Sequence, residues 1–177
     1  ILHRLVGSEM CIRDRRIIAM GLNCEAENKP TANPCGICSN CKAILQDRYE
    51  DVLEIDAASN TGVDDVREII SSLKYRPSKG SYKVFIIDEV HMLSNSAFNA
   101  LLKTIEEPPS FVKFIFCTTE MQKIPITILS RCQKYHLNRV TLTSLCNYLE
   151  EIAELEKLDI SKEAVAIIAR NSEGSIR

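Results

Sequence analysis

Residues 84–91 read Val84-Phe85-Ile86-Ile87-Asp88-Glu89-Val90-His91. The apolar run is typical of a strand that is buried on both faces of a parallel sheet, and it ends in two carboxylates. The carboxyl ends of parallel strands are where α/β proteins place their ligand chemistry. Asp88 at such a position can hold Mg²⁺, and Glu89 can orient or deprotonate an attacking water. For this segment taken alone, a solvated acidic turn remains the alternative.

The segments around this run alternate between strands and helices. Apolar runs predict strands at residues 52–56, 83–88 and 112–118, and amphipathic helical patterns follow the first two. This alternation predicts an α/β fold with a parallel sheet and flanking helices. Near the end of the chain, helical patterns at about 143–158 and 161–172 predict the start of a small helical domain.

Several short signals predict where these elements begin and end. Residues 59–61 and Ser94 supply N-cap chemistry for two helices, and Pro108-Pro109 ends the second of them. A weaker strand is predicted at residues 134–137.

Four cysteines form a C-x10-C-x2-C-x2-C cluster in a proline-rich loop: Cys24, Cys35, Cys38 and Cys41. Two C-x2-C steps bring three sulfurs around one centre, and the first cysteine can return as the fourth ligand. Zinc is favoured because a closed four-sulfur site suits a redox-inert ion. An iron–sulfur cluster, or thiols without a metal, remain alternatives. Four protein ligands leave no open position for a substrate, so the metal is expected to be structural.

The composition excludes several classes of protein. The chain has 177 residues with a net charge of −2, so it is not a polyelectrolyte binder as a whole. It contains no apolar run of membrane-spanning length. Eight cysteines are compatible with a secreted disulfide scaffold, but four are clustered and the rest are scattered. Reduced thiols with one metal cluster fit a cytoplasmic protein better.

For other polar residues, the sequence alone does not separate a binding role from an ordinary structural one. A hydroxyl of Thr118 or Thr119 at a strand end can bind water or phosphate, but β-branched residues are common in any strand. Arg131, within Ser130-Arg131-Cys132, and Arg177 would usually be surface charges.

Three motifs together carry a family resemblance: residues 88–93 (DEVHML), 99–109 (NALLKTIEEPP) and 130–132 (SRC). With them, the chain resembles the bacterial DNA polymerase III gamma/tau subunits, the AAA+ ATPases of the sliding-clamp loader. The resemblance runs from about Arg16 to Arg177, and the cysteine spacing extends it.

The resemblance implies a role for each polar residue. Asp88 and Glu89 look like the Walker B pair, with Asp88 for Mg²⁺ and Glu89 for the water. Thr119 looks like the sensor-1 group that reports the γ-phosphate of ATP. Arg131 looks like the arginine finger, which acts in trans on a neighbouring subunit. Arg177 looks like the sensor-2 arginine of the helical lid.

The resemblance also implies an organisation and partners. The core is expected over residues 16–138, with a zinc module at about 24–41, and the lid begins at 139–177. Implied partners are the delta and delta-prime subunits, further gamma/tau copies, the sliding clamp and primed template DNA.

One departure from the family concerns the N-terminal run ILHRLVGSEMCIRDR, residues 1–15. The family carries a G-x-x-x-x-G-K-[ST] phosphate loop just before the helix that ends near Asn23, and this sequence has no such motif. We therefore expect residues 1–15 to be foreign to the protein, the first strand of the sheet to be missing, and ATP to bind weakly or not at all. Sequencing the source DNA upstream of the Arg16 codon tests this directly.

Three functions are compared on these grounds. The first is a clamp-loader motor subunit, favoured by Asp88-Glu89. The second is a non-catalytic structural subunit resembling delta-prime, favoured by the lack of a phosphate loop. A zinc-dependent DNA-binding module is excluded by the net charge and the absence of a basic recognition helix. Any DNA contact is expected at phosphates, from the helix N-terminus at residues 60–63.

Overall fold

The computed structural model describes residues 2–6, 12–27, 29–59, 62–136, 139–172 and 174. The chain divides into two compact units, Ile1–His136 and Leu137–Arg177.

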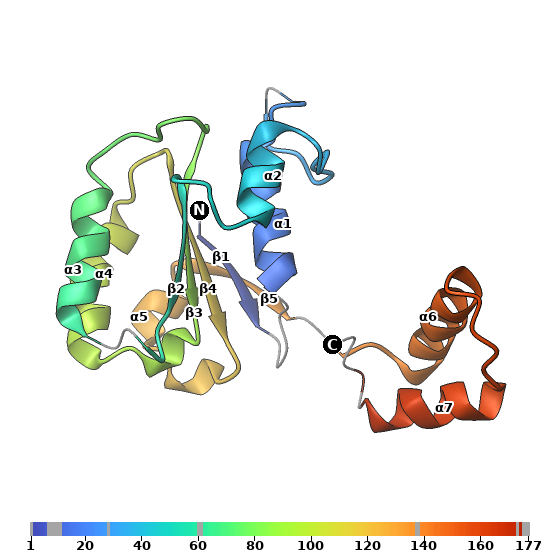
Figure 1. The fold of residues 1–177 in the computed structure, drawn as a ribbon. Coiled ribbons are helices and arrows are strands. Elements are labelled where there is room, and N and C mark those ends of the chain that lie inside the picture. Colours follow the sequence, from blue (N-terminus) through green and yellow to red (C-terminus); the bar gives the residue numbers. More distant parts are fainter. Residues whose placement is uncertain are drawn as a thin grey trace. The chain divides into compact units, whose positions relative to one another are not determined.

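A parallel sheet forms the centre of the first unit (Figure 1). Its strand order is β2-β3-β4-β1-β5, and every neighbouring pair is parallel. The strands are β1 (Leu2–Val6), β2 (Val52–Asp56), β3 (Lys83–Asp88), β4 (Val112–Thr118) and β5 (Cys132–His136). The parallel α/β fold that the sequence predicts is therefore confirmed.

The position of β1 differs from the expectation. β1 lies between β4 and β5, with Leu5 opposite Cys117 on one side and Tyr135 on the other. The expectation that the first strand is missing is therefore wrong. Strand pairing uses main-chain N–H and C=O groups, which any segment without proline offers, and Leu and Val suit a strand.

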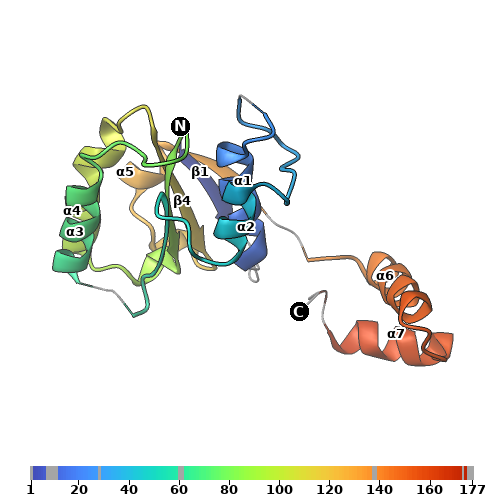
Figure 2. The same ribbon diagram turned by 45° about the horizontal axis from the view of Figure 1, so that its top comes forward.

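Helices cover both faces of the sheet (Figures 1 and 2). On one side lie α1 (Ile12–Asn23) and α2 (Ser39–Leu45). On the other lie α3 (Val63–Ser72), α4 (Asn95–Glu106) and the short α5 (Ile126–Leu129). Two 3-10 turns, η1 (Val90–Met92) and η2 (Met121–Lys123), follow β3 and β4. Within the described part of the chain, no helix is both long and apolar enough to cross a membrane.

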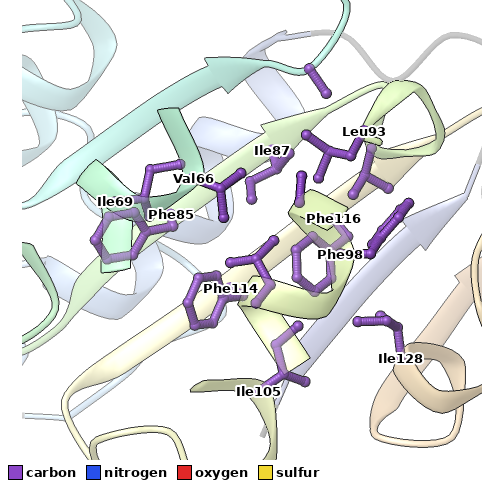
Figure 3. Packing of buried hydrophobic residues seen from close by; sticks show 14 of the residues in the cluster. Val66, Ile69, Phe85, Ile87, Leu93, Phe98, Ile105, Phe114, Phe116 and Ile128 are labelled. Atoms are coloured by element: carbon purple, nitrogen blue, oxygen red, sulfur yellow. The ribbon is translucent and has the colours of Figure 1, made fainter. Parts of the chain in front are cut away.

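The alternation of side chains along β3 builds two separate cores. Phe85 and Ile87 pack into the cluster beneath α3 and α4, shown in Figure 3. Val84 and Ile86 point to the opposite face and pack with residues of α1 and α2. Each buried side chain of this size contributes about 1.5–3 kcal/mol of transfer free energy. A strand that is apolar on both faces is thus held in place from both sides, which fixes the position of its carboxyl end.

Some helices and strands begin where the local sequence predicts, and others do not. The hydroxyl of Ser94 accepts a hydrogen bond from Ala97 N at 3.2 Å, as expected of an N-cap. The N-cap of α3 is instead Gly62, without a side-chain hydrogen bond, and the hydroxyl of Ser59 donates to Asp56 O. Residues 60 and 61 lie outside the described residues. The last strand begins at Cys132, two residues before the predicted start.

The second unit contains two helices that pack on each other, α6 (Leu142–Leu155) and α7 (Lys162–Asn171). Thr141 and Ser161 cap their N-termini. Among the residues of this unit that the structure describes, the buried apolar side chains are Leu145, Ala153, Val165 and Ala169.

Candidate active site and metal centre

The carboxyl ends of β3 and β4 form the first candidate site. The two strands pair in parallel, with Ile87 opposite Phe116, so that their last residues, Asp88 and Thr118, lie at the same edge of the sheet. Glu89 leaves the strand in the left-handed region, with φ 43° and ψ 43°. A residue other than glycine rarely adopts this conformation, and when it does, the backbone often serves a functional site. This turn directs the Glu89 side chain toward the end of β4.

The carboxylate of Glu89 is held on one oxygen. The hydroxyl of Thr119 donates to Glu89 Oε2 at 3.4 Å, and His91 Nδ1 lies 3.3 Å from the same oxygen. The structure therefore brings together Glu89 and Thr119, for which the family resemblance implies different tasks at one nucleotide site.

The side chain of His91, which contacts Glu89, is almost fully buried. Its Nδ1 also lies 3.0 Å from Thr118 Oγ1, and its Nε2 lies 3.4 Å from Glu120 Oε1. The ammonium group of Lys123, 2.8 Å from Glu120 Oε1, holds the pKa of Glu120 below its usual range. Glu120 therefore stays ionised beside the ring at neutral pH.

Asp88 is the residue expected to hold Mg²⁺. Its Oδ2 lies 2.8 Å from a guanidinium nitrogen of Arg15, and its Oδ1 accepts a hydrogen bond from Glu89 N at 3.0 Å. Arg15 is buried, and its Nε has no hydrogen-bond partner among the described residues. A positive charge thus already faces the carboxylate. The residues present here do not fit Mg²⁺ as long as Arg15 keeps this position.

The four clustered cysteines form the second candidate site. Their sulfur atoms all lie within 4.8 Å of one another, among residues that are buried or half-buried. A tetrahedron of sulfurs around zinc, with Zn–S bonds of 2.3 Å, has edges of about 3.8 Å. The donor set and its spacing therefore fit a zinc ion: Cys24, Cys35, Cys38 and Cys41.

Main-chain N–H groups point at three of these sulfurs. Cys35 N donates to Cys24 Sγ at 3.5 Å, Cys38 N to Cys35 Sγ at 3.4 Å and Cys41 N to Cys38 Sγ at 3.4 Å. The N–H groups of Cys35 and Ala26 hold the pKa of the Cys24 thiol below its usual range. Burial raises the pKa of the Cys41 thiol to about 12. A metal ion would have to displace that proton, so its binding must release protons.

Arg131 has different contacts from Glu89, Thr119 and His91. Its guanidinium donates to Thr127 O at 2.7 Å and to Glu106 Oε1 at 2.9 Å. About two fifths of its side-chain surface is exposed (39%). The structure therefore places this arginine at the surface, held by α4 and α5.

The other predicted residues lie outside the described part of the chain. Arg177 is one of them, and so are Asn60 and Thr61 at the start of α3.

Sequence reasoning missed two residues of the first site, Arg15 and His91, together with their contacts. The pair of Arg15 and Asp88 was missed because residues 1–15 were set apart from the fold. The contacts of His91 were missed because Glu120 belongs to a turn that no periodic pattern places. The sequence did offer one signal. His91 follows Glu89 by two residues, which is close enough for its ring to contact that carboxylate.

Comparison with known proteins decides the family. The sequence profile of the family described as DNA polymerase III, delta subunit matches residues 7–141. The DNA polymerase III subunit tau of Escherichia coli K12 is 49% identical over 162 residues, which make up 92% of this chain. The chain belongs to the DNA polymerase III gamma/tau family. It spans only 25% of the length of that E. coli subunit.

Other gamma/tau relatives give the same result. The tau subunit of Bacillus subtilis is 48% identical over 162 residues, and the chain covers 28% of it. The gamma subunit of Buchnera aphidicola from Baizongia pistaciae is 46% identical, and the chain covers 43% of it. The family resemblance that the motifs carry is therefore confirmed.

Solved structures show the fold. A DNA polymerase III gamma subunit-related protein of Thermotoga maritima matches with a TM-score of 0.56 and 23% identity, over 97% of this chain and 53% of that one. The RuvB Holliday junction branch migration motor of the same organism matches with a TM-score of 0.62 and 18% identity, over 98% and 50%. At these identities the likeness concerns the fold alone, and it agrees with the parallel α/β architecture.

Proposed function

We propose that this chain is part of a clamp-loader motor subunit of the DNA polymerase III holoenzyme. In this role, ATP binding and hydrolysis drive the loading of a sliding clamp onto primed DNA during replication. The observation that carries the proposal is the Glu89 carboxylate, which Thr119 and His91 hold at the ends of two central strands. This geometry occurs in a chain that is 49% identical to a tau subunit.

The residues have distinct tasks in this proposal. Glu89 orients the attacking water and accepts its proton, through the oxygen that Thr119 leaves free. Thr119 senses the γ-phosphate, because its hydroxyl lies beside that carboxylate. Arg177 acts from the lid, as the family resemblance implies. No step is assigned to Mg²⁺, since Arg15 occupies the Asp88 carboxylate.

Arg131 is proposed to act in trans. A guanidinium stabilises the charge that develops on a phosphoryl group in flight. Its exposure, and its contacts with Glu106 and Thr127 rather than with Glu89, support a role toward a neighbouring subunit. Hydrolysis would then require assembly, because no single subunit holds a complete site.

The cysteine cluster is proposed to hold a structural zinc ion. Four thiolate ligands leave no open coordination position, so the ion would contribute to folding rather than to chemistry. The residues that would hold it are the four that the structure brings together.

The proposed partners follow from the family. They are the delta and delta-prime subunits, further gamma/tau copies, the sliding clamp and primed template DNA. We place the protein in the cytoplasm, in line with its clustered free thiols. Contact with DNA phosphates at the start of α3 remains part of the proposal.

A second function has specific support. A non-catalytic structural subunit resembling delta-prime would need no phosphate loop, and none occurs in the sequence. The ion pair between Arg15 and Asp88 favours the same role, because it blocks the carboxylate.

Two substitutions in the full-length subunit, assembled with its partners, test the motor function. Glu89→Gln should keep ATP binding and reduce hydrolysis at least about 100-fold, because the amide accepts no proton. Arg131→Ala should leave ATP binding by the isolated subunit unchanged and reduce hydrolysis by the assembly about 1,000-fold. Glu107→Gln and Arg48→Ala, which alter exposed residues of the same types, serve as matched controls. Full DNA-stimulated turnover in the Arg131→Ala assembly would exclude the trans role.

A further inference from the structure

The contacts of His91 are more specific than those of a packing residue. Only 7% of its side-chain surface is exposed, yet both ring nitrogens face polar groups. These groups come from two strand ends and the turn that follows: Glu89, Thr118 and Glu120.

The ring itself is fixed from the β4 side. Thr118 is buried, and its Oγ1 accepts a hydrogen bond from Glu120 N at 3.0 Å while it lies 3.0 Å from His91 Nδ1. Glu120 Oε1 lies 3.4 Å from the second ring nitrogen. The ring therefore has contacts at both of its nitrogens, which leaves it little freedom to rotate.

The fixed ring acts on one oxygen of Glu89. His91 Nδ1 is hydrogen-bonded to Thr118 Oγ1 at 3.0 Å and also lies 3.3 Å from Glu89 Oε2. Because a carboxylate only accepts hydrogen bonds, a ring that carries a proton on Nδ1 attracts this oxygen. Thr119 reaches the same Oε2. With Oε2 held twice, Oε1 is the oxygen that remains to receive a proton. The Glu89 side chain is 38% exposed, so this oxygen can meet a water from outside.

We infer that His91 is a positioning residue for the general base Glu89, and that it acts through Nδ1. This inference rests on the proposed ATP hydrolysis and assigns a task within it. His91 touches neither substrate nor reacting atoms. It sets the direction of the Glu89 carboxylate, and it links that direction to the end of β4, where Thr119 senses the phosphate. The ring thus couples phosphate sensing to the orientation of the base.

Two amide substitutions separate the two ring nitrogens. The side-chain nitrogen of asparagine takes nearly the place of Nδ1, whereas that of glutamine takes nearly the place of Nε2. His91→Asn should therefore keep the contact with Glu89, and His91→Gln should keep only the contact with Glu120. Both variants are polar and similar in size to histidine, so they also serve if His91→Ala fails to fold.

The experiment measures kcat and KM for ATP in the reconstituted assembly with clamp and primed DNA. His91→Ala and His91→Gln should lower kcat about 10- to 100-fold, because a displacement of about 1 Å at a catalytic group has effects of this size. KM should change less than about twofold, and His91→Asn should restore kcat to within about threefold of the wild type. Met92→Ala, which alters an exposed neighbour in the same turn, should leave both constants unchanged.

The outcomes distinguish this inference from the function on which it rests. If Glu89→Gln hydrolyses ATP normally, the proposed function fails. If Glu89→Gln is inactive while His91→Ala matches the wild type, or if glutamine restores kcat as well as asparagine does, only the positioning role is overturned. Combining His91→Ala with Glu89→Gln should cause no further loss, since both changes act on one group. A further loss of tenfold or more would contradict the coupling.

Discussion

The carboxylate of Asp51 accepts hydrogen bonds from three consecutive main-chain N–H groups in the loop before β3. The distances are 2.8 Å from Ser78 N, 2.9 Å from Lys79 N and 3.1 Å from Gly80 N. Burial by itself would raise the pKa of Asp51, but these N–H groups outweigh it and hold the pKa below its usual range. The ionised side chain thus fixes the loop that leads into the strand of the candidate site.

Replacing Asp51 by asparagine should lower the free energy of unfolding by about 1–2 kcal/mol at pH 7, because a neutral amide is a weaker acceptor. The pKa in the folded state lies below the unfolded value of about 3.9. The contribution is therefore complete above about pH 4 and is lost as the pH falls through the folded pKa. Urea unfolding of both proteins between about pH 3 and pH 7 checks this.

Glu50→Gln, at the exposed neighbour of Asp51, is the control and should change the free energy of unfolding by less than about 0.5 kcal/mol. A constant difference at all pH values would contradict the assignment.

The cysteine cluster allows a prediction at the same scale. Replacing any one of Cys24, Cys35, Cys38 or Cys41 by serine should release the metal, because a hydroxyl is a poor substitute for a thiolate ligand. Metal analysis of the purified proteins should give one zinc per chain for the wild type and for Cys146→Ser, a control outside the cluster. One zinc per chain in all four cluster variants would refute the site, and iron with acid-labile sulfide would favour an iron–sulfur cluster.

At the scale of whole elements, the amount that sequence predicts depends on how an element is held. The bounds of β3 and β4 follow directly from their apolar runs, because burial on both faces demands such residues. The edge strand β2 is only partly buried, yet its short apolar run gives its bounds as well. The last strand begins earlier than predicted because Cys132 and Gln133 lack an apolar pattern, and only pairing with β1 makes them a strand. β1 itself is placed by its neighbours.

The contacts of the candidate site also differ in how far the sequence predicts them. The meeting of Glu89 and Thr119 follows from the parallel pairing of two predictable strands. The contact of His91 with Glu120 does not, because it depends on a left-handed backbone at Glu89 and on a turn after β4. Side chains that are set by irregular backbone lie beyond what periodic patterns can reveal.

The end of α1 joins three elements through Asn23. Its side-chain amide donates to Tyr82 O and accepts from Tyr82 N, both at 2.9 Å, just before β3 begins. Its main-chain oxygen accepts from Asn40 Nδ2 at 3.0 Å, which connects α2, the helix that contains Cys41 of the cysteine cluster. Asn23 and Asn40 are both buried, so the cluster is anchored to the strand that carries Asp88.

Asn23→Ala should therefore destabilise the core by about 1–3 kcal/mol, because two partly buried main-chain groups of Tyr82 lose their partners. Asn23→Asp should cost less, since a carboxylate still accepts from Tyr82 N. Urea unfolding in the presence of zinc measures both, with Asn33→Ala, in the exposed part of the metal loop, as the control. Equal stability of Asn23→Ala and the wild type would show that the anchor is unimportant.

At the scale of the whole molecule, the polar groups proposed for hydrolysis divide between two places in the first unit. Glu89 and Thr119 meet at the strand ends, whereas Arg131 is held by Glu106 and Thr127. Under the proposed function, a site divided in this way is complete only when a second subunit supplies the missing arginine. The proposed hydrolysis would then depend on assembly.

The last prediction concerns ATP binding by the chain as a whole. Tight phosphate binding needs main-chain N–H groups and a lysine from a G-x-x-x-x-G-K-[ST] loop, and this sequence contains none. Arg15 also faces Asp88, where a phosphate-bound cation would belong. Fluorescence titration with labelled ATP should give a Kd weaker than about 1 mM, which corresponds to about −4 kcal/mol. Replacing residues 1–15 by a strand followed by such a loop should tighten Kd at least about 100-fold.

Arg15→Ala is the matched control for that replacement. It frees the Asp88 carboxylate but supplies neither the lysine nor the N–H groups, so its Kd should stay within about threefold of the original chain. If Arg15→Ala alone restores tight binding, the ion pair, rather than the lack of a loop, limits the nucleotide site. If the loop replacement also fails to bind ATP while it keeps its fold and its zinc, the motor function fails. The structural subunit then becomes the better description, because its role needs only the sheet, the metal module and an exposed Arg131.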